Sequence, residues 1–249
     1  GLTRINDYDD RKNSVVLEIK NQLAHLPYPV RPLALKVWRA VANADKRQEI
    51  SMLPRFFADS LSRPAKPVND RLYLNLGVAN FYTWMAYSIY DDFIDEEGIP
   101  DLLPIANIMH RKSVYSYQRL SPPASLLKNT YDQVDLANSW ELANTRAAIQ
   151  GDTINITSIP NYRGGLVLAK RALGHVLGPL IIMETDVAIT GQQKRLVRRG
   201  FYHYLIARQL SDDAHDWIKD LEKGQLNFVV SHLLNLCNIK PGIYNIAEL

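Results

Sequence analysis

The sequence predicts an all-α protein, and two observations point to this class. Apolar residues recur at intervals of three and four, as at Val16, Ile19 and Leu23, and not at intervals of two. Pro, Gly and small polar residues gather in short segments that separate these helical stretches. The chain has 249 residues, of which 47% are apolar and 22% charged, as in ordinary globular proteins. We expect one all-α domain that spans residues 1–249.

The helical stretches follow one another along the chain. The first contains Val16, Ile19 and Leu23, and the second contains Leu33, Val37 and Val41. Breaks between helices are expected where the helix-breaking residues cluster, at 26–32, 62–70, 96–104, 121–125 and 158–165. The β-branched segment TINITSIP (153–160) resembles a strand, but no neighbouring segment offers a partner, so we expect a kink or a loop.

Two of the expected helices are long. One runs from about Asn69 to Gly98 and the other from about Gly191 to Gly224. Each ends in a group of acidic residues that is followed by a glycine. Aromatic and apolar residues fill the turns before both acidic groups, so we expect these ends to extend from helices that face the core.

Charge, cysteine content and hydropathy exclude several classes of function. The net charge of +3 is small and its cations are dispersed, so nucleic-acid binding has no support. The single cysteine, Cys237, excludes an intrachain disulfide, and we interpret it as a buried thiol of a cytoplasmic protein. No window is apolar enough for stable membrane insertion. The chain begins at Gly1 without a methionine, so we expect a piece trimmed from a longer chain.

The first long helix ends in SIYDDFIDEEG (88–98). A helix C-terminus carries partial negative charge, so each carboxylate there costs roughly 0.3–1 kcal/mol, and Lys or Arg is the usual choice. Asp91 lies four positions before Asp95 and Asp92 three positions before it, so the three side chains share one face of the helix. Like charges in this arrangement repel each other unless a cation binds between them.

The second long helix carries a stripe of three carboxylates at intervals of four. The stripe consists of Asp212, Asp216 and Asp220, with Asp213 beside it. Lys219 and Lys223 place cations near the same end, a mixture suited to a ligand that is both anionic and metal-bound. Oxygen ligands without cysteine favour a hard cation, and Mg²⁺ takes only one or two carboxylates, with water and phosphate completing its shell. Two facing carboxylate helices are therefore expected to hold a magnesium diphosphate, although solvated acidic faces are the simpler alternative.

These residues resemble the class I isoprenoid synthases, the superfamily of terpene cyclases and trans-prenyl diphosphate synthases. DDFID is similar to the first aspartate-rich motif, DDxxD. FYHYLIARQLSDDAHD is similar to the prenyl synthase pattern around its second motif, with Gln209, Asp212, Asp213 and Asp216 in the matching places. Asp212, Asp216 and Asp220 also fit the spacing of the cyclase N-x-x-x-S-x-x-x-E triad, and KGQLN (223–227) resembles the segment after that triad with one residue missing.

The resemblance implies a fold, an activity and a set of site residues. It implies an antiparallel helical bundle around a central apolar cavity, three Mg²⁺ ions, an isoprenyl diphosphate substrate and, as an open possibility, a homodimer. The implied metal ligands and catalytic residues are Asp91, Asp92, Asp95, Asp212, Asp216 and Asp220. The implied diphosphate-binding residues are Arg163, Lys170, Arg171, Lys219 and Lys223, and the implied pocket residues are Phe81, Trp84, Tyr204 and Gln209, with Tyr87 and Tyr90 as further aromatic candidates.

Three alternatives remain open beside a magnesium-dependent terpene synthase. The first is a trans-prenyltransferase, although the early G-K-R segment and the R-R-G segment after the first aspartates, which hold its second substrate, do not appear in place. The second is a carboxylate-bridged di-iron bundle, because Asp212 and His215 have the spacing of one of its ligand pairs. The third is a bundle without activity that docks partners through a basic patch of Lys194, Arg195, Arg198 and Arg199.

Overall fold

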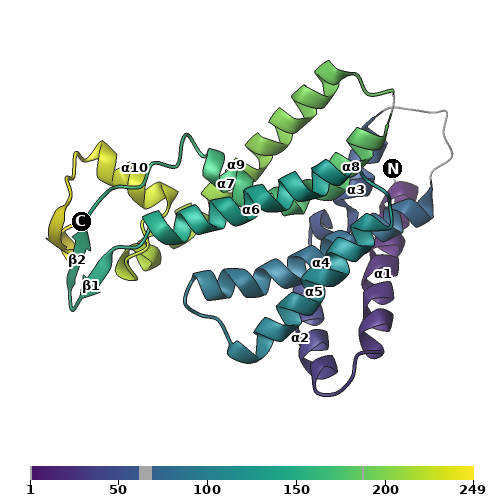
Figure 1. Cartoon of the computed structure of the whole chain (residues 1–249), viewed down its shortest axis with the longest axis horizontal. Helices are drawn as coiled ribbons and strands as arrows, with labels where there is room; N and C mark the ends of the chain where they lie inside the picture. The colour runs from purple at the N-terminus through teal and green to yellow at the C-terminus, as the bar shows by residue number, and fades with distance from the viewer. Residues whose placement is uncertain (1, 62–68, 187) are drawn as a thin grey trace. The chain divides into compact units, whose positions relative to one another are not determined.

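The computed structural model describes residues 2–61, 69–186 and 188–249, and the side chains of these from residue 10 onward (Figure 1). Helices dominate, which confirms the predicted all-α class at the level of overall content. The expected break at 62–70 lies mostly outside the described residues. The chain divides into two compact units, which we call the first unit (Gly1–Lys128 with Gly174–Thr190) and the second unit (Asn129–Leu173 with Gly191–Leu249).

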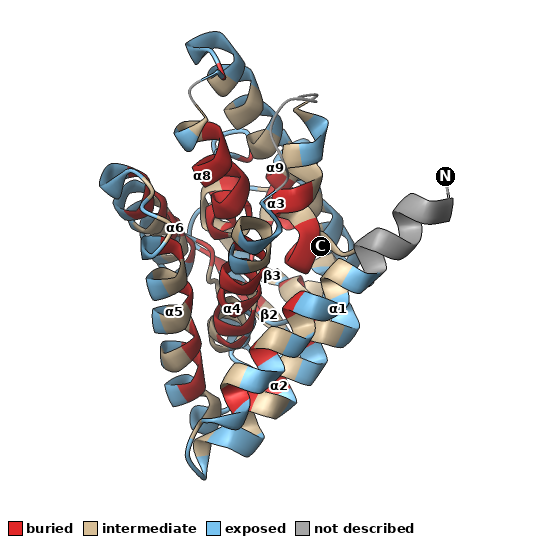
Figure 2. Cartoon of the chain, turned by 90° about the vertical axis from the view of Figure 1, so that its right-hand side faces the viewer, coloured by how far each residue is buried: buried red, intermediate tan, exposed pale blue. Residues whose placement is uncertain are grey.

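The first unit is built from helices around α4. In chain order, its elements are α1 (Leu2–Ala24), α2 (Val30–Ala44), α3 (Glu49–Ser60), α4 (Asp70–Ile94), the short 3-10 helix η1 (Pro100–Leu102), α5 (Leu103–Gln118) and α8 (Leu177–Thr185). Helix α4 contacts α1, α2, α3, α5 and α8. Figure 2 shows α4 and α8 as largely buried, as expected for helices that are apolar on every side.

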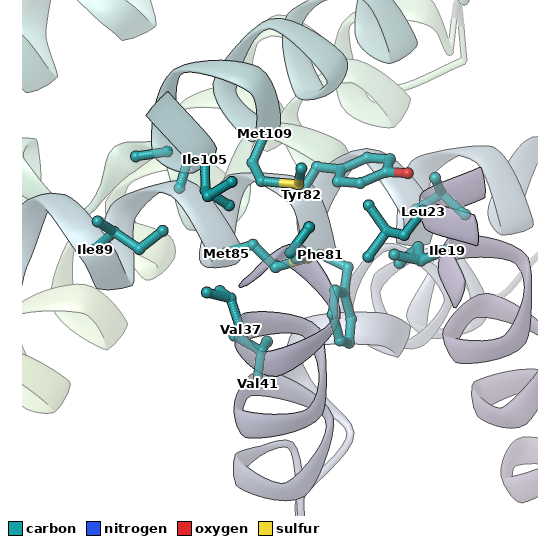
Figure 3. Close-up of a cluster of buried hydrophobic side chains, with 14 of the residues drawn as sticks. Ile19, Leu23, Val37, Val41, Phe81, Tyr82, Met85, Ile89, Ile105 and Met109 are labelled. Atoms are coloured by element: carbon teal, nitrogen blue, oxygen red, sulfur yellow. The ribbon is translucent and has the colours of Figure 1, made fainter. Parts of the chain in front are cut away.

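The core of the first unit lies where α1, α2, α4 and α5 converge (Figure 3). Phe81, Met85 and Ile89 supply the α4 side of this cluster, and all three are buried. The Tyr82 hydroxyl, also buried, donates a hydrogen bond to Gln22 Oε1 on α1 over 2.8 Å. The facing side chains are Ile19 and Leu23 from α1, Val37 and Val41 from α2, and Ile105 and Met109 from α5. This packing confirms the predicted helical spacing of the N-terminal apolar residues.

The second unit combines helices with a small sheet. Its elements are α6 (Ala124–Asn144, which begins in the first unit), β1 (Ala148–Gln150), β2 (Thr153–Ile156), α7 (Leu166–Arg171), the 3-10 helix η2 (Leu173–Val176, which ends in the first unit), α9 (Gly191–Glu222), α10 (Phe228–Leu236), β3 (Gly242–Asn245) and the 3-10 helix η3 (Ile246–Glu248). The strands form an antiparallel sheet in the order β1-β2-β3. Ile154 and Ile156 on β2 pack against Leu221, Val230 and Leu234.

The sheet corrects the expectation for residues 153–160. Thr153–Ile156 form the central strand, and only the end of the segment is a loop. One partner strand precedes it across the two-residue turn Gly151-Asp152, in which Gly151 has a φ of 59°. The other partner, Gly242–Asn245, lies far away in the sequence. The expectation was wrong because the Gly-Asp turn brings one partner strand directly before the segment, and the other partner comes from a part of the chain that is distant in sequence.

Two further expectations concern Cys237 and the membrane. Cys237 follows the last residue of α10 and is exposed, so its interpretation as a buried thiol was wrong. The apolar residues around it lie on a short helix of which only one side is covered. Among the described helices, none has the length and apolar character that a membrane crossing requires.

Two glycines in long helices are expected to respond in opposite ways to alanine. At Gly77 on α4, a Cβ atom would lie 2.5 Å from the backbone oxygen of Ser51 and 2.9 Å from a methyl group of Val15. Gly77→Ala should therefore lower the free energy of unfolding by about 1–3 kcal/mol despite the better helix propensity of alanine.

Gly200 on α9 provides the matched control, because nothing among the described residues lies within 4 Å of its added Cβ. Gly200→Ala should raise the free energy of unfolding by about 0.5–1 kcal/mol. Urea denaturation followed by circular dichroism measures both changes. Two changes of the same sign would contradict the close packing of α1 and α3 on α4.

Candidate functional site

The first acidic group lies where α4 ends. The last helical residue is Ile94, and the backbone N–H groups of Glu96 and Glu97 donate to the carbonyls of Phe93 (3.2 Å) and Asp92 (2.8 Å). This pair of bonds is the Schellman arrangement, which needs a left-handed residue at its turn. Here that residue is Glu96, with a φ of 62°, and not a glycine. The sequence thus predicted the end of the helix within a few residues, but it did not predict the residue that turns the chain.

Gly98 has a different role from the one expected of a terminating glycine. Its φ lies outside the left-handed region. An added Cβ would collide with the ring of Phe93, so the chain after the turn passes directly over that ring. The contact fixes the acidic segment against the last turn of α4.

The surroundings of Asp92 at the end of α4 raise its pKa. Partial removal from water raises this pKa, and the negative charges of Asp91 and Glu97 raise it further. Asp92 is exposed, whereas Asp91 and Asp95 are half-buried. The end of α4 therefore holds a concentrated negative charge that is accessible to solvent and that a bound cation would stabilise.

Aromatic side chains occupy the turns of α4 before this acidic group. The Trp84 ring lies 4.0 Å from the imidazole of His175, measured between centroids, and Tyr87 makes edge contacts with Tyr90, His110 and His175. Trp84, Tyr87 and Tyr90 are half-buried. Phe81, another predicted pocket residue, is fully buried and belongs to the hydrophobic cluster of Figure 3.

The second acidic group occupies the last three turns of α9, and its members face two ways. Asp212 and Asp216 are exposed, whereas Asp213 and Asp220 are half-buried. Asp213 and Asp220 are seven positions apart, so they share the side of the helix that meets the start of α10. The predicted stripe is therefore divided between a solvent side and a packed side. Asp216 and Asp220 remain close enough for the charge of Asp216 to raise the pKa of Asp220.

The packed side binds the N-terminus of α10. Asn227 caps α10 with its Oδ1 atom, which accepts from the N–H of Val230 over 2.8 Å. Its Nδ2 group donates to Asp220 Oδ2 over 2.7 Å and to the carbonyl oxygen of Asp213 over 3.2 Å. Asp213 Oδ2 accepts from the N–H of Phe228, the first residue of α10, over 2.9 Å. A carboxylate at a helix N-terminus is favoured by the dipole of that helix, so Asp213 anchors α10.

Asp213 is also the most strongly perturbed acid of this group. Burial raises its pKa to about 7, and this effect exceeds the opposing effects of the Phe228 hydrogen bond and of Arg171. Tyr162 lies nearby, and burial also raises the pKa of its hydroxyl. This hydroxyl donates to the carbonyl of Leu226 over 3.0 Å. Asp213 is therefore close to half-protonated at neutral pH.

Arg171 and Glu141 form an ion pair, and the charges of both act on Asp213. Arg171 Nη1 contacts both carboxylate oxygens of Glu141 at 2.7 and 2.8 Å, and Glu141 is only 3% exposed. Arg171 was predicted to bind diphosphate, and in this structure its guanidinium is engaged with Glu141. Nothing in the sequence indicated Glu141, because a single glutamate on a helix gives no local sign of burial.

The other predicted diphosphate-binding and pocket residues lie mostly at the surface. Arg163 is exposed and has a φ of 53°, and Lys170 is half-buried at the end of α7. Lys219 and Lys223 are exposed, and their charges lower the pKa of Asp220. Tyr204 and Gln209 are half-buried on α9, and Arg208 lies over the Tyr204 ring. Lys219 and Lys223 therefore act on Asp220, as Arg171 acts on Asp213.

The described residues offer no ready-made protein shell for a metal ion. In neither unit do three His, Cys, Asp or Glu side chains among the described residues form a group arranged to hold a metal ion. Mg²⁺ takes only one or two carboxylates per ion, and water and phosphate oxygens fill its remaining positions. His215, the histidine of the di-iron alternative, is exposed, and its Nδ1 atom lies 2.6 Å from the carbonyl of Ser211.

The two acidic groups belong to different units. Asp91, Asp92 and Asp95 lie in the first unit, and Asp212, Asp216 and Asp220 lie in the second. Their convergence around one cavity stays a prediction.

Asn227 has no assigned role in the sequence-based prediction, although an asparagine before the apolar run FVV is a recognisable signal for a helix start.

The pKa of Asp213 predicts how stability depends on pH. Because this pKa is about 7 in the folded state and 3.8 in the reference state, the folded protein retains the proton over a range in which the unfolded chain releases it. The free energy of unfolding should therefore fall as pH rises from about 4 to about 7. Asp213→Asn keeps an oxygen that can accept the hydrogen bond from the N–H of Phe228. Because asparagine does not titrate, the variant removes this decrease in the free energy of unfolding with pH. Its stability relative to the wild type should rise by about 2–4 kcal/mol between pH 4 and pH 8.

Urea denaturation at pH 4, 6 and 8 measures this difference. Asp135→Asn is the matched control, because Asp135 is an exposed aspartate on α6 of the same unit. Its difference from the wild type should not change with pH. A pH-independent difference for Asp213→Asn would contradict the assigned burial.

No family model, no curated protein and no solved structure matches this chain. Its function is therefore argued from its own residues.

Proposed function

We propose that the protein is a class I terpene synthase that uses magnesium to ionise an allylic isoprenyl diphosphate. One observation carries the proposal: the C-terminal part of each long helix bears exposed carboxylates, Asp92 at the end of α4 and Asp212 and Asp216 in the last three turns of α9. Stability gives no reason for these carboxylates, and at the end of α4 the helix dipole and the charges around Asp92 both disfavour them. Binding of a cation gives a reason, because it converts the repulsion into attraction.

The chain can contribute ligands from both groups. One or two of Asp91, Asp92 and Asp95 would hold metal at the end of α4, together with water and phosphate oxygens. At the end of α9, Asp212 and Asp216 are exposed, and the Oδ1 atom of Asp220 accepts no hydrogen bond from the described residues. Bound magnesium supplies positive charge that stabilises the departing diphosphate. Asp213 is not among the proposed ligands, because its carboxylate accepts the hydrogen bond at the start of α10.

Cationic and aromatic side chains supply the other requirements of this reaction. Lys219 and Lys223 place positive charge beside Asp220, where they can bind the oxygens of a diphosphate. The rings of Trp84, Tyr87 and Tyr90 lie within about two helical turns before Asp91. Each ring face could stabilise a carbocation by about 0.5–2 kcal/mol. The expected product is a cyclised, eliminated or hydroxylated isoprenoid.

The decisive experiment measures release of diphosphate from geranyl, farnesyl and geranylgeranyl diphosphate. Release should occur with Mg²⁺ and stop when EDTA is added, because the leaving group needs its charge neutralised. Volatile or alcohol products without isopentenyl diphosphate identify a terpene synthase. Longer diphosphates that form only with isopentenyl diphosphate would identify a prenyltransferase. Tightly bound iron without diphosphate release would favour the di-iron alternative.

Single substitutions test the two acidic groups separately. Asp92→Asn and Asp216→Asn should each lower kcat by about 100-fold or more, because each removes a charged ligand that acts on the leaving group. Both residues are exposed, so the variants should unfold at the temperature of the wild type.

Asp101→Asn and Asp135→Asn are matched controls. Both residues are exposed aspartates, one in η1 shortly after the first acidic group and one on α6. Their kcat values should stay within about twofold of the wild type. Equal losses in the control variants, or full activity of Asp92→Asn, would show that the acidic groups do not bind the metal.

A further inference from the structure

A second candidate site lies in the first unit at the opposite end of α4. A cavity of about 470 Å³ opens between α1, α3 and the first turns of α4. Its size falls within the usual range of ligand sites, about 300–1,000 Å³. The lining residues are Arg11, Ser14 and Val15 from α1, Met52 and Arg55 from α3, and Asp70, Arg71, Tyr73 and Leu74 from α4.

A buried arginine lies at the centre of the polar side of this cavity. Arg55 is only 8% exposed, and its guanidinium lies over the Tyr73 ring at 5.0 Å. Its Nε atom donates to Asp59 over 3.0 Å, and its Nη1 atom donates to Asp70 Oδ1 over 3.1 Å. These contacts leave Nη2 without a hydrogen bond from Arg55 to any described residue. A guanidinium with an open edge binds carboxylate or phosphate well.

The other lining charges add to this preference for an anion. Arg11 also pairs with Asp70, so one carboxylate is shared between two arginines. Arg71 is exposed and makes no ion pair or hydrogen bond through its side chain with the part of the chain that the structure describes. Asp59, Asp70 and Asp186 all act on the Tyr73 hydroxyl, so these three carboxylates balance the three arginines in number. An anion would therefore be bound by the open edge of Arg55 and by Arg71, not by a net excess of charge.

The rest of the cavity wall is apolar. Val15, Met52 and Leu74 line it together with the ring of Tyr73. Val15 and Met52 are buried, and the flexible methionine side chain can adapt to an aliphatic group. Burial raises the pKa of the Tyr73 hydroxyl, so this group stays a neutral donor at physiological pH. Inorganic phosphate alone would leave this apolar surface unused.

We infer that this cavity binds a small amphiphile that has one acidic head group and an aliphatic chain. The head group lies against Arg55 and Arg71, and the chain lies against Val15, Met52 and Leu74. The site is distinct from the proposed metal-binding carboxylates, because Asp70 and Asp91 are separated by about 30 Å of continuous helix. The inference is independent of the proposed function.

Isothermal titration calorimetry of the full chain in EDTA tests the inference, because EDTA removes any contribution of magnesium. Octanoate and octyl phosphate are the probes, below the concentrations at which they form micelles. Octanol controls for the charge, and acetate and inorganic phosphate control for the chain. At least one octyl anion should bind about tenfold more tightly than octanol and than its own head group alone. The comparison of the two octyl anions identifies the preferred head group.

Two variants locate the binding. Arg71→Gln should raise the Kd of the octyl anion by about fivefold to tenfold, because it removes a charge-assisted contact. It should fold normally, since Arg71 is exposed. Leu74→Trp should abolish binding by filling the cavity. Arg47→Gln, an exposed arginine between α2 and α3, is the matched control and should leave the Kd unchanged.

Three outcomes would overturn the inference. They are octanol binding as tightly as the octyl anions, simple anions binding as tightly as their octyl forms, and an unchanged Kd for Arg71→Gln. Thermal unfolding of each variant shows that it is folded, and Arg71→Gln by itself decides the question if Leu74→Trp does not fold.

Discussion

The burial of α4 on every side is the constraint on which the first unit depends. Five other helices contact it, and its buried residues run from Leu76 to Ile89 with few interruptions. A helix held in this way cannot rotate or shift without opening the core. Its two ends are therefore fixed in the first unit, and both carry unusual charge: the carboxylates from Asp91 onward at one end, and Asp70 between two arginines at the other. The core therefore holds the charged residues at both ends of α4 in fixed positions, which a mobile segment would not do.

The second acidic group meets two requirements that conflict. Asp213 caps α10 best as a carboxylate, yet its burial favours the protonated form, so the anchor of α10 titrates near neutral pH. Asp220 shares its charge between Asn227 and the solvent side of α9. A motif that looks uniform in the sequence therefore separates into residues that hold the structure and residues that face solvent. Asp212 and Asp216 are the exposed residues that the proposed cation would meet.

The long helices could be predicted because their signals are local: apolar spacing along α4 and α9, and acidic residues that end each of them. The central strand could not be recognised in the same way, since one of its partners lies about ninety residues later and only the short turn at Gly151 gave a nearby signal. The acidic residues stand out in the sequence by type and spacing, and their role in a metal site stays a prediction. Their division into packed and exposed residues was not, because it depends on Asn227 and the N-terminus of α10. The ion pair of Glu141 and Arg171 has no signal in the sequence at all, since its burial results from tertiary packing.

The turn after α9 restricts how this chain can vary in length. Gly224 turns the chain with a φ of 76°, and it packs so closely on the Ala147 backbone that no side chain fits. Its carbonyl accepts from the N–H of Ala147 over 2.7 Å, and Leu226 donates to the carbonyl of Thr145 over 2.8 Å. Asn227 must then reach Asp220 and cap α10 at once. An insertion of even one residue here would break the register of the whole connection, so the short spacing of KGQLN is a geometric necessity of this architecture.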